Sequence, residues 1–280
     1  IKVYTRDTSS GTRGGFMEFI GFSEAKEDDS VLVDGFIVAG NDEIINAVQQ
    51  DDFAIGYVSL STFSPSLFKG FLYEGIEPSE ENVLNGSYGL ARTFKYMLRD
   101  DYSVYGDDSS RYEEISKAFV AYIQTIDGKA TIASAKGIVD LTSGDSWDVV
   151  SQDFPVCSED NSDLTVKFGG SDSVEKIARA LSPDFAAKCG DFVPEHNHTG
   201  SSNAWKGLIG GNSAIDDGLS IHIGFLSRDF KDSEVAEIRG IIAADAIVAV
   251  GNLNNPVDSL TAEELTKIYG GDITDWLDLQ

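Results

Sequence analysis

The chain has 280 residues, of which 41% are hydrophobic, and its 47 acidic and 21 basic side chains give a formal net charge of -26. Nucleic acids and anionic lipid surfaces are excluded as partners, because both would repel so acidic a protein. No run of 18 or more apolar residues occurs, so the sequence predicts no membrane-spanning helix. A small anion is still an acceptable ligand, since distant surface charges are screened over about 10 Å.

Short apolar runs bounded by turn-forming residues predict buried strands, and amphipathic stretches between them predict helices. The predicted strands cover residues 1–4, 53–60, 164–168, 221–225 and 241–250. The predicted helices cover 112–125, 173–181 and 261–269, and the last opens on a capping box of Thr261 and Glu264. This alternation predicts an α/β protein with a parallel sheet. The polar stretch 142–163 is expected to be a surface linker that joins two structural units.

Three segments place glycine and small hydroxyl residues directly before an expected helix, at 5–13, 169–174 and 199–203. The N–H groups at a helix start carry partial positive charge, and hydroxyls add donors without adding charge. Each segment alone is typical of an ordinary N-cap. Together they favour a site for a tetrahedral oxyanion, with Arg6 as the charged ligand because its guanidinium can bind two oxygens at once. The alternative for Arg6 is a salt bridge to a carboxylate such as Asp7.

The two cysteines, Cys157 and Cys189, lack the spacing of a zinc or dithiol motif. A single disulfide in an extracytoplasmic protein and two unrelated buried thiols are both compatible with the sequence. His196 and His198 alternate near a strand end, and His222 is the third histidine. Three histidines could hold a metal, but a polar loop beside the binding region is the plainer interpretation. We therefore expect no metal and no cofactor.

Five segments resemble motifs of the phosphate-binding proteins that serve phosphate ABC transporters, the PstS family. They are TRDTSSGTRGGF at 5–16, AIGYVSLSTF at 54–63, GGSDSVEKIARAL at 169–181, IHIGFLSRDFKDSE at 221–234 and the stretch 246–276 that ends in ITDW. The family motifs they resemble include SREDGSGTREAF, AIGYVSLGY and GSTSV. In the family GSTSV comes first and the Ser-Gly-Thr segment follows ITNW, so the resemblance implies a circular permutant. An excerpt from tandem copies is the alternative, and the sequence does not distinguish a natural from an engineered rotation.

The resemblance implies a two-lobed type II periplasmic-binding-protein fold with the anion in a cleft between the lobes. Residues 1–58 with 248–280 would form lobe II, and residues 59–247 would form lobe I. Crossing strands around 56–60 and 248–252 would form the hinge between them.

Matched residue by residue, the resemblance implies a set of phosphate ligands in both lobes: Arg6, Ser10, Gly11, Thr12, Asp172, Ser173, Ser201 and Ser227. The chain departs from the family at Thr8, which replaces a carboxylate, at Asp172, which replaces a threonine, and in the eroded GSGSG loop at 200–204. A carboxylate accepts a hydrogen bond only from a protonated oxyanion, so Asp172 would favour hydrogen phosphate over sulfate. The alternative for Asp172 is a helix cap that points away from the cleft.

The expected function is an extracytoplasmic solute-binding protein that binds inorganic phosphate, delivers it to an ABC transporter permease and catalyses no reaction. We expect a monomer in the periplasm or at the cell surface, and the sequence leaves open a lipid anchor on the full-length protein. One alternative is a surface sensory or adhesive module with lost or altered anion specificity. The other is a phosphatase, which would need a nucleophile beside a base, and neither Ser10 nor Ser201 has a histidine within its motif.

Overall fold

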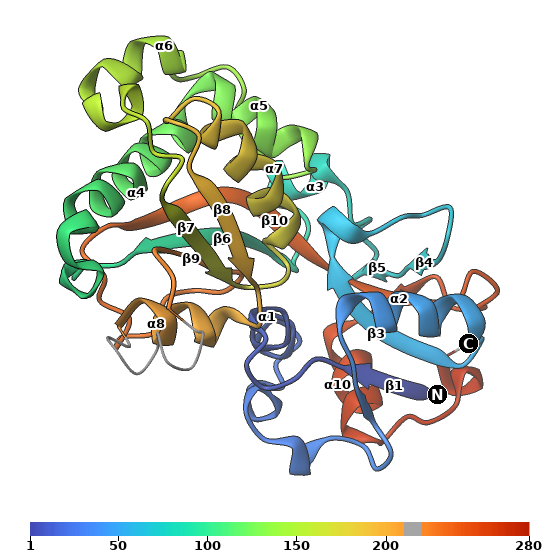
Figure 1. Ribbon diagram of the computed structural model, residues 1–280. Helices are drawn as coiled ribbons and strands as arrows, with labels where there is room; N and C mark the ends of the chain where they lie inside the picture. The colour runs from blue at the N-terminus through green and yellow to red at the C-terminus, as the bar shows by residue number, and fades with distance from the viewer. Residues whose placement is uncertain (210–219, 280) are drawn as a thin grey trace. The chain divides into compact units, whose positions relative to one another are not determined.

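The computed structural model describes residues 1–209 and 220–279. The chain divides into two compact units (Figure 1). Unit 1 comprises Ile1–Arg92 with Asp245–Gln280, and unit 2 comprises Thr93–Ala244. The chain passes from one unit to the other within strands β6 (Ala91–Leu98) and β10 (Arg239–Gly251). In the described ranges, every helix is too short or too polar to cross a bilayer.

Unit 1 is built around a mixed sheet in the order β2-β1-β3-β10. Its strands are β1 (Lys2–Thr5), β2 (Ile37–Val38), β3 (Ala54–Ser59) and part of β10, with β4 (Lys69–Gly70) also on β10, and β5 (Leu72–Tyr73) paired with β11 (Ser259–Leu260). Its helices are α1 (Gly11–Phe19), α2 (Asn41–Gln50), α3 (Glu80–Leu84) and α10 (Ala262–Gly270). Strand β1 is parallel to both neighbours, whereas β10 runs antiparallel to β3.

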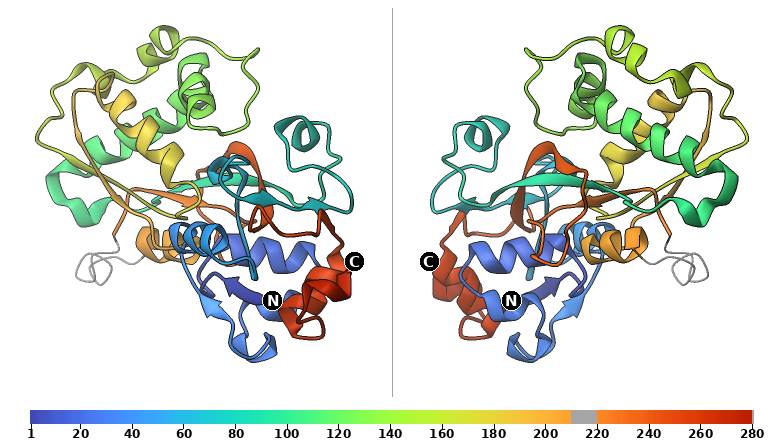
Figure 2. Two further views of the ribbon diagram at one scale, coloured as in Figure 1. Left: turned by 90° about the vertical axis from the view of Figure 1, so that its right-hand side faces the viewer. Right: turned by 90° about the vertical axis from the view of Figure 1, so that its left-hand side faces the viewer.

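Aromatic rings tie the helices of unit 1 to its sheet. Tyr57 of β3 is fully buried and stacks on Phe16 of α1, with 4.1 Å between ring centroids. Tyr269 of α10 lies against both rings and donates a hydrogen bond to the Tyr4 carbonyl of β1. The N-terminus of Ile1 also donates to the Thr274 carbonyl, and Figures 1 and 2 show the N-terminus beside the C-terminal segment. The two ends of the chain therefore belong to one packed body.

Unit 2 is built around the strands β6-β9-β7-β8, which continue the same nine-stranded sheet beyond β10. Its elements are β7 (Thr165–Gly170), β8 (Val193–Asn197), β9 (Ile223–Leu226), α4 (Ser109–Gln124), α5 (Ile126–Ser134), α6 (Trp147–Val150), α7 (Glu175–Ala186) and α8 (Ser201–Ile209). Phe168 and Phe225 pack with Phe119 of α4 and Phe185 of α7, whereas Leu226 packs in a separate apolar cluster that contains residues of α8. Both faces of this part of the sheet are covered, with α4 and α8 on opposite sides in Figure 1.

The secondary structure follows the predicted pattern closely. Each of the five predicted strands and three predicted helices is present, and Thr261 and Glu264 form the capping box. Short 3-10 turns occupy Ser23–Lys26, Asp29–Val31, Leu60–Thr62, Ser103–Asp108, Ser151–Asp153, Pro155–Ser158 and Trp276–Leu279. The nine-stranded sheet, however, is mixed rather than parallel, because β6 and β10 each run antiparallel to a neighbour.

The prediction that residues 142–163 form a linker between two units is wrong. The whole stretch lies inside unit 2. Trp147 and Val156 are buried in its core, and a disulfide ties Cys157 to Cys189 beyond α7. The stretch is polar along most of its length, but its few apolar side chains anchor it to α4 and α7.

Residues 59–92, which we expected in the larger lobe, are grouped with unit 1. Strand β4 pairs with β10, and β5 pairs with β11. Phe71 stacks on Trp276, and Lys69 forms an ion pair with Asp258. These contacts connect the segment to the C-terminal part of unit 1 and account for the difference from the predicted boundary after residue 58.

Candidate functional site

Arg6 follows β1 in unit 1 and makes polar contacts with residues of α2 and β3. The side chain is 3% exposed, and Nη1 donates to Asn41 Oδ1 at 2.7 Å. Its backbone N–H donates to the Tyr57 hydroxyl at 3.1 Å. Asp7, the predicted alternative partner, accepts hydrogen bonds from the backbone N–H and the hydroxyl of Ser9. Neutral groups of β3 and α2 therefore help to orient the predicted anion ligand.

A second arginine, Arg13, which sequence reasoning did not single out, contacts the backbone of Arg6. Arg13 is fully buried, and its Nη1 donates to the Arg6 carbonyl at 3.0 Å and reaches Asp29 Oδ1 at 2.6 Å. Its Nε donates to the Ala25 carbonyl at 2.8 Å. Burial of a guanidinium is costly unless its N–H groups are bonded, so these contacts fix the loop that carries Arg6.

The Ser-Gly-Thr segment forms the start of α1. Ser10 is its N-cap, and its hydroxyl oxygen accepts a hydrogen bond from Arg13 N at 3.4 Å. The ordinary cap interpretation is therefore correct for Ser10, although its hydroxyl proton can still be donated. Gly11 and Thr12 are buried in the first turn. N–H groups in this turn have no carbonyl within the helix to bond, which makes a helix start suitable for an anion.

In unit 2, the predicted serines converge on one buried cluster. Ser171 follows β7, Ser201 begins α8 and Ser227 follows β9. Ser171 Oγ donates to Ser227 Oγ at 2.8 Å, and Ser227 Oγ lies 3.4 Å from Ser201 Oγ. The Ser227 N–H donates to Ser201 Oγ at 3.1 Å, and the Ser173 N–H donates to Ser171 Oγ at 3.3 Å. We call these four residues the serine cluster; each is at most 1% exposed.

Asp172 lies in the turn between β7 and α7 and is half-buried. The N-cap of α7 is Val174, and Asp172 contributes its backbone carbonyl to the turn by accepting from the Glu175 N–H. Asp172 is therefore not the N-cap residue of α7. Its role as an acceptor for a protonated oxyanion stays a prediction.

The histidines do not gather as a metal site. His196 Nδ1 lies 3.1 Å from His198 Nε2, whereas His222 packs elsewhere against the rings of Tyr105 and Tyr112. Within residues 1–209 and 220–279, no three His, Cys, Asp or Glu side chains form a group that could bind a metal ion. Burial lowers the pKa of His196 to about 4 and that of His222 to about 3. These two rings are therefore neutral at pH 7.

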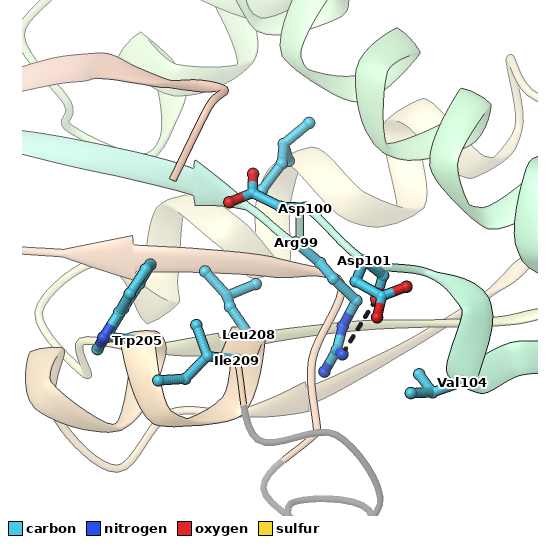
Figure 3. Close-up of a pocket in the computed structure, with 8 residues that line it drawn as sticks. Arg99, Asp100, Asp101, Val104, Trp205, Leu208 and Ile209 are labelled. Atoms are coloured by element: carbon cyan, nitrogen blue, oxygen red, sulfur yellow. Dashed lines mark hydrogen bonds between the residues drawn. The ribbon is translucent and has the colours of Figure 1, made fainter. Parts of the chain in front are cut away.

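A separate pocket of about 200 Å³ in unit 2 contains none of the predicted ligands (Figure 3). It is lined by Leu98, Arg99, Asp100, Asp101, Val104, Trp205, Leu208 and Ile209. The Arg99 guanidinium is bonded to the carbonyls of Asp101, Gly207 and Ile221 and to the Ser220 hydroxyl. These bonds occupy four of its five N–H donors, so the pocket is a weak candidate for an anion site.

Sequence reasoning missed several residues that contact the predicted ligands of the two units: Arg13, Asn41, Tyr57 and Ser171. Ser171 and Arg13 lay within the quoted motifs, so their proximity in sequence to Asp172 and Thr12 was an available signal. Asn41 and Tyr57 are 35 and 51 positions from Arg6. No local pattern connects them to it.

Comparison with known proteins gives matches over the whole chain. Residues 156–280 match the family model of a PBP superfamily domain. Phosphate-binding protein PstS 2 of Streptococcus pneumoniae is 26% identical over 280 residues, covering 99% of this chain and 86% of that protein. The protein of the same name from Streptococcus agalactiae is 26% identical over 286 residues, covering 100% and 87%.

A solved structure of a phosphate-binding protein of a phosphate ABC transporter from Streptococcus pneumoniae matches with a TM-score of 0.69 and 24% identity, covering 100% of this chain and 99% of that one. This match shows the fold. The predicted circular permutation is not shown, because each of these alignments runs nearly end to end through both chains. The relatives are named for binding rather than for catalysis, as we expected of this chain. The resemblance seen in the motifs is confirmed, because the chain is similar to PstS proteins over nearly its whole length and residues 156–280 match a PBP superfamily domain.

Proposed function

We propose that this chain binds inorganic phosphate in a cleft between its two lobes. The ligands would be Arg6, Ser10, Gly11 and Thr12 from unit 1 and Asp172, Ser173, Ser201 and Ser227 from unit 2. The observation that carries the proposal is the serine cluster, in which hydroxyls from three separate elements are buried together. Uncharged donors of this kind suit a dianion, because they stabilise its charge without adding a counterion that also attracts other anions.

The energetics of such a site are sufficient for tight binding. A hydrogen bond to a charged group contributes about 1.5–3 kcal/mol. Several of them, with Arg6 as the single charged donor, could reach the roughly 8 kcal/mol of a micromolar complex after the entropic cost of association. The buried contacts of Arg6 and Arg13 support tight binding. A protein side chain that is already held in place loses less conformational freedom when phosphate binds.

Calorimetric titration with phosphate, arsenate and sulfate at pH 6 and pH 8 tests the proposal. We expect binding heat with phosphate and with arsenate, which share shape and protonation, and none with sulfate. Lys117→Met removes an exposed charge on α4 and serves as the control, with no expected change in affinity. Absence of heat with phosphate would overturn the proposal and favour a surface module with lost or altered anion specificity. Turnover of p-nitrophenyl phosphate would instead favour the phosphatase.

Asp172 is proposed to select the protonated anion. Asp172→Asn replaces an obligate acceptor by a group that can also donate. We expect this variant to bind phosphate more weakly and to gain affinity for sulfate. Unchanged phosphate affinity and unchanged rejection of sulfate would show that the carboxylate has no part in selection.

We also propose an extracytoplasmic monomer that delivers phosphate to an ABC transporter permease. The names of the relatives support the transport role. The Cys157–Cys189 disulfide supports the location, because such bonds persist in oxidising compartments. Thiol labelling of protein taken from its native cells is expected to leave both cysteines unlabelled, and full labelling would contradict this location. Light scattering on the purified protein tests the monomer.

A further inference from the structure

A chain of hydrogen bonds leads from helix α7 to the anion-binding turn of unit 2. Ser182 Oγ of α7 lies 2.8 Å from His196 Nε2, and His196 Nδ1 lies 3.1 Å from His198 Nε2. His198 Nδ1 lies 3.0 Å from the Ser171 carbonyl oxygen. These three side chains, which we call the histidine relay, end on the residue that donates to Ser227 within the serine cluster.

Proton counting assigns a direction to each bond of the histidine relay. A carbonyl oxygen can only accept, so His198 must carry its proton on Nδ1. Nε2 of a neutral His198 is then an acceptor, so His196 must donate to it from Nδ1. Nε2 of His196 is left to accept from the Ser182 hydroxyl. With both rings uncharged, each ring nitrogen is satisfied.

The surroundings of the two rings favour this neutral state. His196 stacks on Phe168 and His198 on Phe225, which shields one face of each ring from water. Desolvation lowers the pKa of both histidines, to about 4 for His196. The charged groups that act on them are Glu175 and Arg179 of α7, with Asp172 also acting on His198. The histidine relay is therefore a set of neutral dipoles at pH 7 rather than a cation for the ligand.

Holding the Ser171 carbonyl also holds the peptide that follows it. In the described residues all peptide bonds are trans, so the Asp172 N–H points opposite to the Ser171 carbonyl. A hydrogen bond accepted by that carbonyl polarises the N–H of the same peptide and strengthens it as a donor. The Val174 N–H donates to the same carbonyl at 3.3 Å from the start of α7.

We propose that His198, oriented by His196 and Ser182, is a positioning residue for the anion site: it directs the Asp172 N–H and keeps Ser171 in the serine cluster. This inference rests on the proposed phosphate site but assigns a role to residues that make no contact with the anion.

The test compares two substitutions that differ in one hydrogen bond. His198→Leu removes the donor to Ser171, whereas His198→Asn keeps one, because the Asn Nδ2 takes the place of the His Nδ1. In titrations with inorganic phosphate at pH 7.5, we expect about a tenfold loss of affinity for His198→Leu and less than about threefold for His198→Asn. Thermal unfolding of both variants checks that they are folded.

A second measurement needs no phosphate. The chain has three histidines, so the imidazole nitrogens in a spectrum of 15N-histidine protein can be assigned individually. We expect the proton on Nδ1 in His196 and His198. His222 is the internal reference with its proton on Nε2, since its Nδ1 accepts from the Lys167 N–H at 2.8 Å.

Equal affinity of wild type and a folded His198→Leu would overturn the positioning role. A proton on Nε2 of His198 would overturn it as well, even if His198→Leu does not fold. Failure of the wild type to bind phosphate would overturn the proposed function, whereas the spectrum would still decide whether the histidine relay exists.

Discussion

The two units present their predicted ligands in different chemical settings. Unit 1 offers Arg6 beside the start of α1, backed by the fully buried guanidinium of Arg13. Unit 2 offers the uncharged serine cluster, backed by the neutral histidine relay. All three histidines and both cysteines of the chain belong to unit 2.

In the proposed site, two helix starts would therefore be prepared for the anion in different ways. A buried cation must be surrounded by carbonyls and hydroxyls, because an unpaired charge is expensive to bury. Neutral hydroxyls can satisfy one another's hydrogen-bonding capacity, but they attract an anion less strongly than a cation does. We therefore expect unit 1 to contribute most of the affinity, and unit 2 to contribute selectivity and sensitivity to acid.

The largest expected effect concerns the disulfide and unit 2. Replacing Cys157 and Cys189 by serine removes a cross-link across 32 positions, which costs about 4 kcal/mol in the chain-entropy model. Urea unfolding followed by fluorescence should show a lower midpoint for the variant than for wild type. Wild type treated with reductant should show a similarly lowered midpoint. Because the serine cluster does not involve either cysteine, phosphate affinity at 25 °C should stay within about twofold. A large loss of affinity in a folded variant would show that the cross-link shapes the site.

The next largest effect is expected at Arg6. Arg6→Met should lower phosphate affinity by about a hundredfold, since it removes the charge-assisted bonds of unit 1. Arg6→Lys keeps the charge without the two-pronged geometry and should fall between this variant and wild type. Calorimetry measures both. If Arg6→Met binds phosphate with the affinity of wild type, the difference between the charged ligand of unit 1 and the neutral ligands of unit 2 has no effect on binding.

Acid should act mainly through unit 2. The pKa of His222 is lowered to about 3 by burial, beside the positive charges of Arg99 and Lys167. Since its unfolded pKa is near 6.5, the unfolded chain binds the extra proton between these values, and stability is lost as pH falls from about 6.5 towards 3. Between pH 7.5 and 4.5 the loss should be on the order of 2 kcal/mol.

His222→Asn provides the comparison for this pH dependence. The Asn Oδ1 can replace Nδ1 as the acceptor for the Lys167 N–H, but it does not titrate. Unfolding free energies measured across the pH range should show a shallower slope than wild type, whatever the absolute stability of the variant. An unchanged slope would mean that other groups account for the acid sensitivity.

The smallest effect is expected for one hydroxyl of the serine cluster. Ser227→Ala removes the central hydroxyl and should weaken phosphate binding about tenfold. Ser116→Ala is the matched control, because Ser116 is equally buried in unit 2 but donates to the Tyr112 carbonyl within α4. Equal affinities of the two variants would place Ser227 outside the site.

What the sequence determined by itself was local. The strands, the helices, the capping box at Thr261 and the Ser10 cap are each indicated by a pattern of residues a few positions apart, so these patterns are visible in the printed order of residues. The motifs likewise indicated the PstS-like resemblance, and they predicted Arg6 as an anion ligand. The polarity of 142–163 misled us, because a few buried side chains outweigh many solvated ones.

Only the tertiary structure decided which groups meet. Ser171, Ser201 and Ser227 come together because β7 and β9 are neighbours in the sheet and α8 begins beside them. Arg6 meets Asn41 and Tyr57, and His198 meets Ser171, through the same kind of long-range pairing. Sheet order and register depend on the packing of the whole unit, so no short stretch of sequence encodes these contacts.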